Sequence, residues 1–180
     1  MGLTKYLIPF AVAFLALVSC GNEPSLQKYL VAKQEDDKFM KIDLAASLLQ
    51  SEGSSFTEEQ QDVLKTIKKV NVVAYKVEEG NLDAYAIEKE IVSEIMSQDK
   101  YKTLMRFGSN TRGTTLKYLG EEDAIDELIV FASDSEKGFA VFRLLGENMR
   151  PDQMLTLMSS IENGDLDLSK FSGLGDLLEF

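Results

Sequence analysis

The segment between Asp126 and Met149 constrains the fold most strongly, because it holds two nearly unbroken apolar runs separated by a short polar turn. The first run lies at 126–133, the second at 138–145, and the sequence SDSEKG joins them. Runs of this length that are rich in Val, Ile and Phe are typical of strands buried on both faces. We therefore predict a hairpin of two central strands.

Strand and helix patterns alternate along the rest of the chain. Further strands are predicted at 39–45, 70–77, 101–107 and 114–119. Helices are predicted after Ser25, after a capping box that begins at Thr57, up to Gln98–Asp99, and after Arg150–Pro151. This order predicts one α+β domain over 26–164. We expect a mostly antiparallel sheet of about five to six strands with three to four helices packed on one face.

Two of these elements carry more specific expectations. In the helix that ends near Gln98, five apolar residues recur with a period of 3.6 and are expected to share its buried face: Ile87, Ile91, Val92, Ile95 and Met96. The strand at 39–45 alternates apolar and charged residues, but Leu48 and Leu49 would also suit a helix, so this element stays ambiguous.

The N-terminus has the organisation of a lipoprotein signal peptide. Lys5 is followed by an apolar stretch at 6–19, which at about 1.5 Å per residue is shorter than the roughly 30 Å core of a bilayer. The stretch ends in LVSCG, which resembles a bacterial lipobox around Cys20. We predict a signal peptide over 1–19 and a lipidated Cys20 with a short tether over 20–25. The alternatives are a cleaved secretory peptide or an uncleaved anchor in which the cysteine is accidental.

The lipid on Cys20 would make a membrane the first partner of the protein, since multiple acyl chains on one residue give stable anchoring. Cys20 is also the only cysteine in the chain. We expect a location in the cell envelope, and among its membranes the outer membrane. Only Glu23 represents the acidic run that follows the cysteine in some surface lipoproteins, so the leaflet stays open.

Composition excludes several classes of function. The chain has no His and one Cys, so it has no Ser-His-Asp triad, no Cys-His pair and no thiolate zinc site. Its net charge of −11 argues against nucleic acid as a partner, because phosphate binding needs clustered Lys and Arg. We therefore expect no nucleic-acid partner, no cofactor, no metal site and no catalytic residue.

Three parts of the chain resemble a known family of bacterial lipoproteins. They are the lipobox around Cys20, the stretch YKTLMRF at 101–107, and the block DELIVFASDSEKGFAVFRLLGENM at 126–149. These features resemble the domain-of-unknown-function 4252 family of Bacteroidota envelopes over roughly 39–163. The resemblance implies a role in the cell-envelope response by association, and it carries over no catalytic residue because the family has no established activity.

Two motifs resemble catalytic or phosphate-binding sites but fit ordinary structure better. The segment Gly108–Thr115 has the glycine spacing of a phosphate-binding loop, yet Thr114 replaces the lysine and a strand follows, so we interpret it as a hairpin loop. Ser25–Lys28 and Ser97–Lys100 match the Ser-x-x-Lys motif of penicillin-binding enzymes without its companion motifs. We interpret them as polar residues at helix ends.

The acidic cluster at Glu121–Asp123, with Asp126 and Glu127, is the densest in the chain. Its spacing matches no calcium loop, although paired carboxylates could serve glycoside hydrolysis without a histidine. A solvated hairpin loop is the simpler interpretation.

The tail at 165–180 is both apolar and acidic. Its residues Phe171, Leu174, Leu177, Leu178 and Phe180 suit a short amphipathic helix weakened by glycines. Either the tail packs on its own domain or is disordered, or it stays mobile and docks in a groove of an envelope protein partner, so these five residues are candidates for partner binding.

These observations favour a non-enzymatic envelope lipoprotein with an interaction or sensing domain. One alternative is a carboxylate-dependent enzyme that acts on envelope glycan, which would need two acidic side chains facing each other across a cleft. The other is a small-ligand carrier, which would need a deep apolar pocket lined by strand residues from 126–145.

Overall fold

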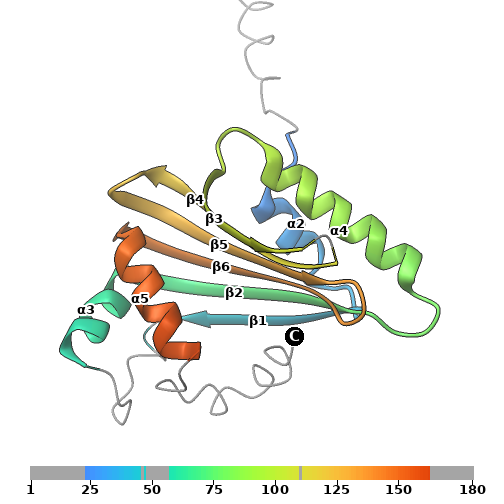
Figure 1. Ribbon diagram of the computed structural model, residues 1–180, viewed down its shortest axis with the longest axis horizontal. Coiled ribbons are helices and arrows are strands. Elements are labelled where there is room, and N and C mark those ends of the chain that lie inside the picture. The colour runs from blue at the N-terminus through green and yellow to red at the C-terminus, as the bar shows by residue number, and fades with distance from the viewer. Residues whose placement is uncertain (1–22, 46, 48–56, 110, 163–180) are drawn as a thin grey trace, which may run out of the picture.

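The computed structural model describes residues 23–45, 47, 57–109 and 111–162, which form an antiparallel sheet with helices against it (Figure 1). The strands are β1 (Phe39–Ala45), β2 (Ile67–Lys76), β3 (Lys102–Gly108), β4 (Arg112–Glu121), β5 (Ala124–Asp134) and β6 (Gly138–Met149). The helices are α2 (Leu26–Ala32), α3 (Glu58–Thr66), α4 (Leu82–Ser97) and α5 (Pro151–Glu162). The predicted α+β class is confirmed.

The strand order is β1-β2-β6-β5-β4-β3, and every neighbouring pair is antiparallel. Strands β5 and β6 occupy the two central positions and form the predicted hairpin, in which Phe131 lies opposite Val141. The turn between them begins at Asp134, whose side chain accepts main-chain hydrogen bonds from Glu136 and Lys137. Local apolar pattern and turn chemistry thus fix the middle of the sheet.

The helices cover both faces of the sheet, which corrects the expectation that they share one. Helices α2 and α4 pack on the face, here called the α4 face, that carries Tyr75, Phe131 and Phe139. Helices α3 and α5 pack at one end of the opposite face, here called the α5 face. The reason lies in β5, where Ile129 points to the first face and Leu128 to the second, and both are buried.

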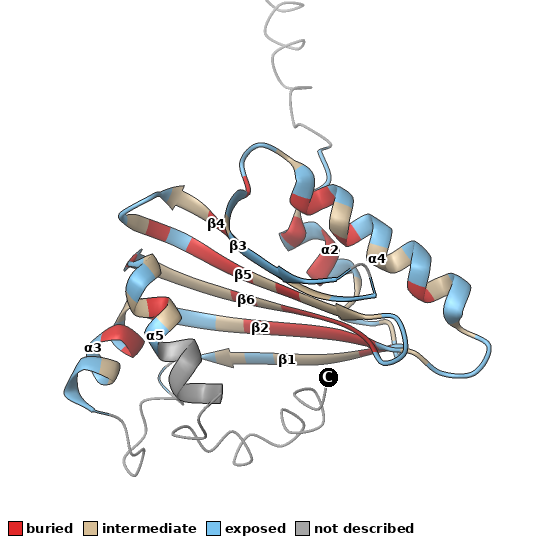
Figure 2. Cartoon of the chain, viewed as in Figure 1, coloured by how far each residue is buried: buried red, intermediate tan, exposed pale blue. Residues whose placement is uncertain are grey.

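Buried residues are concentrated on the central strands and on the inward sides of the helices (Figure 2). On the α4 face the core is aromatic: the rings of Tyr75 and Phe139 stack with centroids 5.9 Å apart, and Phe39 and Phe131 meet Phe139 edge-on. Such ring pairs add to the stability given by area burial alone. This core fixes the positions of α4 and of the strands beneath it.

Helix α4 buries a different stripe from the one predicted. Val92, Ile95 and Met96 are buried as expected, but Ile87 is 61% exposed and Ile91 is also exposed. The buried stripe instead begins with Tyr85, whose hydroxyl donates to the main-chain oxygen of Asp134 at 3.0 Å. Tyr85 therefore faces the sheet, where it also packs against Phe139, and Ile87 faces solvent.

The predicted helix starts at Thr57 and Ser25 are confirmed. The Thr57 hydroxyl accepts a hydrogen bond from the Gln60 amide, and the Gln60 side chain accepts one from the Thr57 amide. The Ser25 hydroxyl accepts from the amide of Lys28, so this Ser-x-x-Lys pair is a helix cap. Each cap satisfies amides that the first turn leaves without partners.

Candidate ligand-binding cleft

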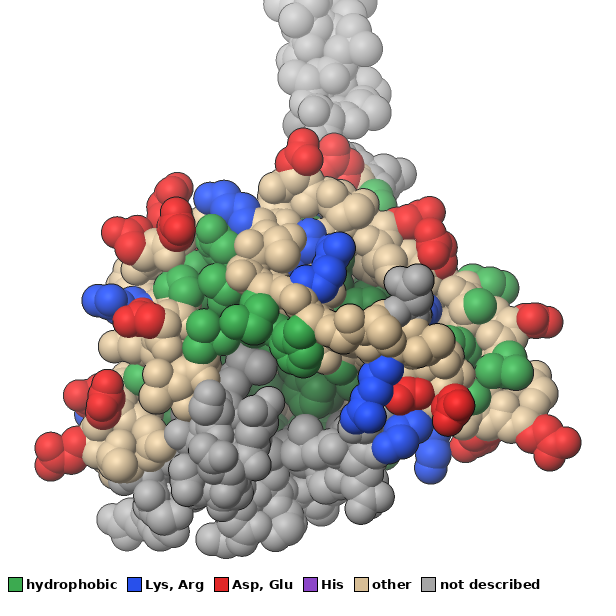
Figure 3. Space-filling model, in the orientation of Figure 1, with side chains coloured by type: hydrophobic (Ala, Val, Ile, Leu, Met, Phe, Trp, Pro, Cys, Tyr) green, Lys and Arg blue, Asp and Glu red, His purple; other side chains and the backbone are tan. Residues whose placement is uncertain are grey.

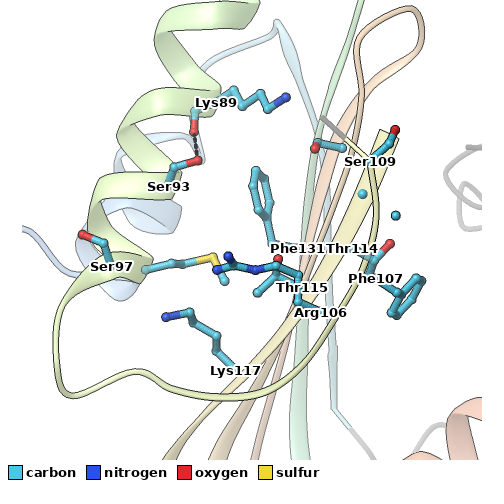
Figure 4. Close-up of a pocket in the computed structure, with 14 residues that line it drawn as sticks. Lys89, Ser93, Ser97, Arg106, Phe107, Ser109, Thr114, Thr115, Lys117 and Phe131 are labelled. Atoms are coloured by element: carbon cyan, nitrogen blue, oxygen red, sulfur yellow. Dashed lines mark hydrogen bonds between the residues drawn. The ribbon is translucent and has the colours of Figure 1, made fainter. Parts of the chain in front are cut away.

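A cleft of about 700 Å³ lies between α4 and the edge of the sheet formed by β3, β4 and β5 (Figure 4). Helix α4 forms one wall, and the hairpin of β3 and β4 forms the other. The polar side chains that matter most for its chemistry are Lys89, Ser93, Arg106, Thr115, Lys117 and Ser133.

Sheet register brings the residues of the cleft floor together. Arg106 on β3 lies opposite Thr115 on β4, and Thr115 lies opposite Phe131 on β5, so the three form one row on the α4 face. Lys117 is two residues further along β4 and therefore points to the same side. Figure 4 shows that the alternate residues Phe107 and Thr114 point away from α4. Strand alternation thus selects the polar side chains for this cleft.

The charge of the cleft is opposite to that of the chain. Its described lining residues include the cations Lys89, Arg106 and Lys117 and no Asp or Glu, whereas the whole chain has a net charge of −11. Arg106 is exposed and forms no ion pair with any described residue. A positive pocket within an acidic protein concentrates field lines and attracts small anions.

The surroundings of Lys117 shift the pKa of its ammonium group. Its side chain is buried, and its Nζ donates to the main-chain oxygen of Tyr101 at 3.1 Å. Burial lowers the pKa of Lys117 below the usual value for lysine, and the positive charge of Arg106 lowers it further. An anion placed between Lys117 and Arg106 would relieve both effects, because it would compensate the desolvated ammonium and separate two like charges.

Hydroxyl groups complete the polar lining. Ser93 lines the cleft, and its Oγ donates to the main-chain oxygen of Lys89 at 2.8 Å (Figure 4). The hydroxyls of Thr115 and Ser133 have no hydrogen-bond partner among the described residues. Guanidinium, ammonium and hydroxyl donors are the groups that hold oxyanions in proteins.

The acidic cluster predicted from the sequence is divided by the fold. Glu121 is the exposed last residue of β4, and Glu122 and Asp123 form the exposed turn between β4 and β5. Glu127 is buried on β5 instead, and Arg143 Nη2 lies 2.8 Å from its Oε2. Among the described residues, no group of three or more acids is arranged to hold a metal ion. The solvated turn is therefore confirmed for the first three residues, and Glu127 has a structural partner.

The glycine-bounded segment Gly108–Thr115 lies at the predicted hairpin, where β3 ends at Gly108 and β4 begins at Arg112. Gly108 has a φ of +107°, and a Cβ at this position would collide with the main chain of Arg112 and Gly113. Part of this hairpin lines the cleft. The interpretation of this segment as part of a hairpin is confirmed, whereas its place in the wall of a cleft was not predicted.

The pocket differs from the one expected for a carrier. Of the strand residues in 126–145, Phe131 and Ser133 line the cleft, and most of the other lining residues come from α4 and the β3–β4 hairpin. The lining of the cleft is polar and apolar in about equal parts, and its charged side chains distinguish it from the apolar pocket expected for a carrier. Sequence reasoning missed Lys89, Arg106 and Lys117, because nothing in their spacing indicates that three separate elements meet.

A second surface lies on the α5 face of the sheet, where Figure 3 shows a patch of apolar side chains. On edge strand β3, Phe107 is 51% exposed and Met105 is also exposed. Exposed apolar side chains that cluster in this way mark surfaces at which another segment can dock.

Several predicted residues lie outside the described part of the chain. They are the signal peptide at 1–19, Cys20, and the tail residues Phe171, Leu174, Leu177, Leu178 and Phe180. Within the described part, no helix combines the length and hydrophobicity that crossing a membrane requires.

Comparison with known proteins places the chain in a family. The model of a family described as "Domain of unknown function (DUF4252)" matches residues 29–157, which span all six strands and the cleft. No curated protein and no solved structure shows a significant match. The match covers most of the chain, and the protein belongs to the DUF4252 family.

Proposed function

We propose that this protein is a non-enzymatic binding domain of the bacterial cell envelope, held at a membrane by lipid on Cys20, and that its cleft takes a small anionic ligand. The observation that carries this proposal is the charge of the cleft. Three cations and no carboxylate line it, in a chain whose net charge is −11. An arrangement that concentrates scarce cations at one hollow favours binding of an oxyanion.

The side chains suit recognition of phosphate or carboxylate groups. The guanidinium of Arg106 can donate two parallel hydrogen bonds to an oxyanion, and the facing Thr115 hydroxyl can donate a third. Lys117 adds a charge from a buried position, where electrostatic interactions are less screened than at the surface. Binding would therefore depend on all three groups.

The cleft favours binding over catalysis. A lysine with a lowered pKa is a candidate general base. However, Lys117 Nζ is engaged with the main-chain oxygen of Tyr101, and no hydrogen bond joins it to a hydroxyl among the described residues of the cleft. The glycan-hydrolase alternative also has weaker support, because no Asp or Glu is among the described lining residues of the cleft and Oε2 of Glu127 is paired with Arg143.

The anchor at the membrane is supported by the sequence around Cys20. The apolar stretch at 6–19, its flanking Lys5 and the single cysteine at its end together resemble a lipoprotein signal. The described chain starts at Glu23, close behind this cysteine. An anchored domain would meet its ligand at or near the membrane surface.

Isothermal titration calorimetry with inorganic pyrophosphate tests the proposal. The wild-type protein should bind with a stoichiometry of one, and Arg106→Glu should weaken binding by roughly tenfold or more, since one charge-assisted pair contributes about 1.5–3 kcal/mol. The matched control is Arg150→Glu, because Arg150 is an exposed arginine at the start of α5, outside the cleft. The proposal fails if pyrophosphate does not bind, or if both variants bind it equally weakly.

A further inference from the structure

The segment that leads from the predicted anchor to the domain is fixed beside one end of the cleft. The side chain of Gln98 donates to the main-chain oxygen of Pro24 at 2.7 Å, and Lys28 Nζ donates to that of Glu23 at 3.2 Å. Gln98 directly follows Ser97, which lines the cleft. The start of the described chain therefore lies next to the C-terminal end of α4.

A second set of contacts joins the cleft to the same place. Lys117 Nζ donates to the main-chain oxygen of Tyr101, and the hydroxyl of Tyr101 accepts a hydrogen bond from the amide of Leu26 at 3.1 Å. Leu26 is the first residue of α2 and follows the tether directly. Figure 1 shows the start of α2 beside the C-terminal end of α4. Two independent sets of contacts thus hold the end of the cleft that is lined by Ser97 and Lys117 near the tether.

The short tether limits how far this end of the cleft can lie from the membrane. Two residues separate Cys20 from Glu23, and an extended chain spans at most about 3.3–3.6 Å per residue, so the three residue steps between them cover roughly 10 Å. The headgroup regions add about 5–7 Å on each side of the hydrocarbon core. A lipidated Cys20 would hold the end of the cleft at Lys117 within reach of lipid headgroups.

From these contacts we infer that the anion taken by the cleft is the phosphate of a phospholipid headgroup in the anchoring membrane. This inference rests on the proposed function, because it needs both the anion site and the lipid on Cys20. Phosphate is also present in soluble phosphate esters, but the position of the tether favours the lipid. The domain would then lie against the membrane in one orientation, with Arg106 and Lys117 engaged.

Anchoring offsets the repulsion expected of an acidic protein. A net charge of −11 opposes approach to anionic lipids, but this repulsion is screened beyond about 8 Å at physiological ionic strength. Tethering gives the headgroups an effective concentration in the millimolar range at the cleft. A site with only millimolar intrinsic affinity is then substantially occupied. The three cations of the cleft are therefore sufficient to hold a headgroup phosphate.

Hydrogen exchange on the lipidated protein, purified from membranes and reconstituted into vesicles, tests the inference. One set of vesicles contains phosphatidylcholine alone, whose phosphate is paired with its own ammonium group, and the other adds anionic phosphatidylglycerol. We expect amides at 93–98 and 112–118 to exchange several-fold more slowly with phosphatidylglycerol, since protection scales with one plus the ratio of ligand concentration to Kd. Arg106→Glu should abolish the difference, and Arg150→Glu should retain it.

A third arm separates the two sources of phosphate. Soluble glycerol 3-phosphate is added to wild-type protein in vesicles of phosphatidylcholine alone. Protection by this compound, with none from phosphatidylglycerol, would overturn the headgroup inference and leave the proposed anion site standing. Equal protection of wild type and Arg106→Glu by phosphatidylglycerol would also overturn it. Lys89→Gln, a milder change in the same cleft, replaces Arg106→Glu if circular dichroism shows that the latter is misfolded.

Discussion

Arg143 Nη2 donates a hydrogen bond to Glu127 Oε2 at 2.8 Å, which joins the two central strands within the layer between the sheet and α2. Their side chains are 8% and 9% exposed, and Arg143 also donates to the side chain of Gln27. A charge that is buried to this extent needs a partner, because desolvation of an isolated ion is costly. Glu127 is therefore best explained as the counterion of Arg143.

Glu127→Leu should destabilise the protein by roughly 3–5 kcal/mol, because it leaves the guanidinium of Arg143 buried without its counterion. The double variant Glu127→Leu/Arg143→Met should recover most of the loss, since apolar residues often replace a buried pair at little cost. Urea denaturation followed by circular dichroism measures both. A double variant as unstable as the single one would contradict this account of the pair.

Gly138→Ala should destabilise the protein by roughly 2 kcal/mol or more. Gly138 has a φ of +131°, and a Cβ there would overlap the main-chain oxygen of Tyr75 on the neighbouring strand. The matched control is Gly80→Ala, where φ is also positive but no atom lies within 4 Å of the added Cβ, so the loss should be about 1–2 kcal/mol. Thermal denaturation measures the loss of stability in both variants. Equal losses would contradict a contribution from the contact with Tyr75, because they would show that the positive φ alone determines the loss.

Arg106→Gln should raise the pKa of Lys117 toward its usual value, because it removes the like charge that adds to the effect of burial. In the wild type, the unfolded chain binds more protons between the lowered pKa and the ordinary value of 10.5, so stability rises with pH across that window. In the variant the pKa of Lys117 in the folded protein lies closer to 10.5. The pH range over which stability rises therefore begins at a higher pH, and the total gain in stability is smaller. NMR titration of the Lys117 side chain measures the pKa, and an unchanged value would contradict the coupling.

Cys20→Ala should move the protein out of the membrane fraction while the domain keeps its fold, because the predicted lipid is the attachment to the membrane. Fractionation of cells with and without high salt measures the location, and circular dichroism of the purified variant measures the fold. A variant that remains with the membrane after the salt wash would show that the attachment does not depend on Cys20.

The parts of the fold that the sequence predicted are those set by local chemistry. The apolar runs that meet at Phe131 and Val141 determine the central hairpin, and the reciprocal bonds of Thr57 and Gln60 determine the start of α3. The exposed side of α4 was not predictable in this way. Tyr85 on its buried side contacts Asp134 and Phe139, which are far from it in the sequence.

The cleft could not be predicted for a similar reason. Lys89, Arg106 and Lys117 belong to α4, β3 and β4, and each taken alone suits a solvated surface. They meet because Arg106 and Thr115 are paired in register and because α4 crosses the edge of the sheet. Long-range pairing of this kind leaves no periodic pattern in the sequence.

An NMR titration of the protein with inorganic pyrophosphate, followed through its amide resonances, tests most directly whether the cleft is the binding site. We predict saturable shifts at Ser93, Thr115 and Lys117, none at the exposed α3 residue Asp62, and loss of the shifts in Arg106→Glu. Shifts that are absent, that do not saturate, or that persist in the variant would contradict the assignment of the cleft as an anion-binding site.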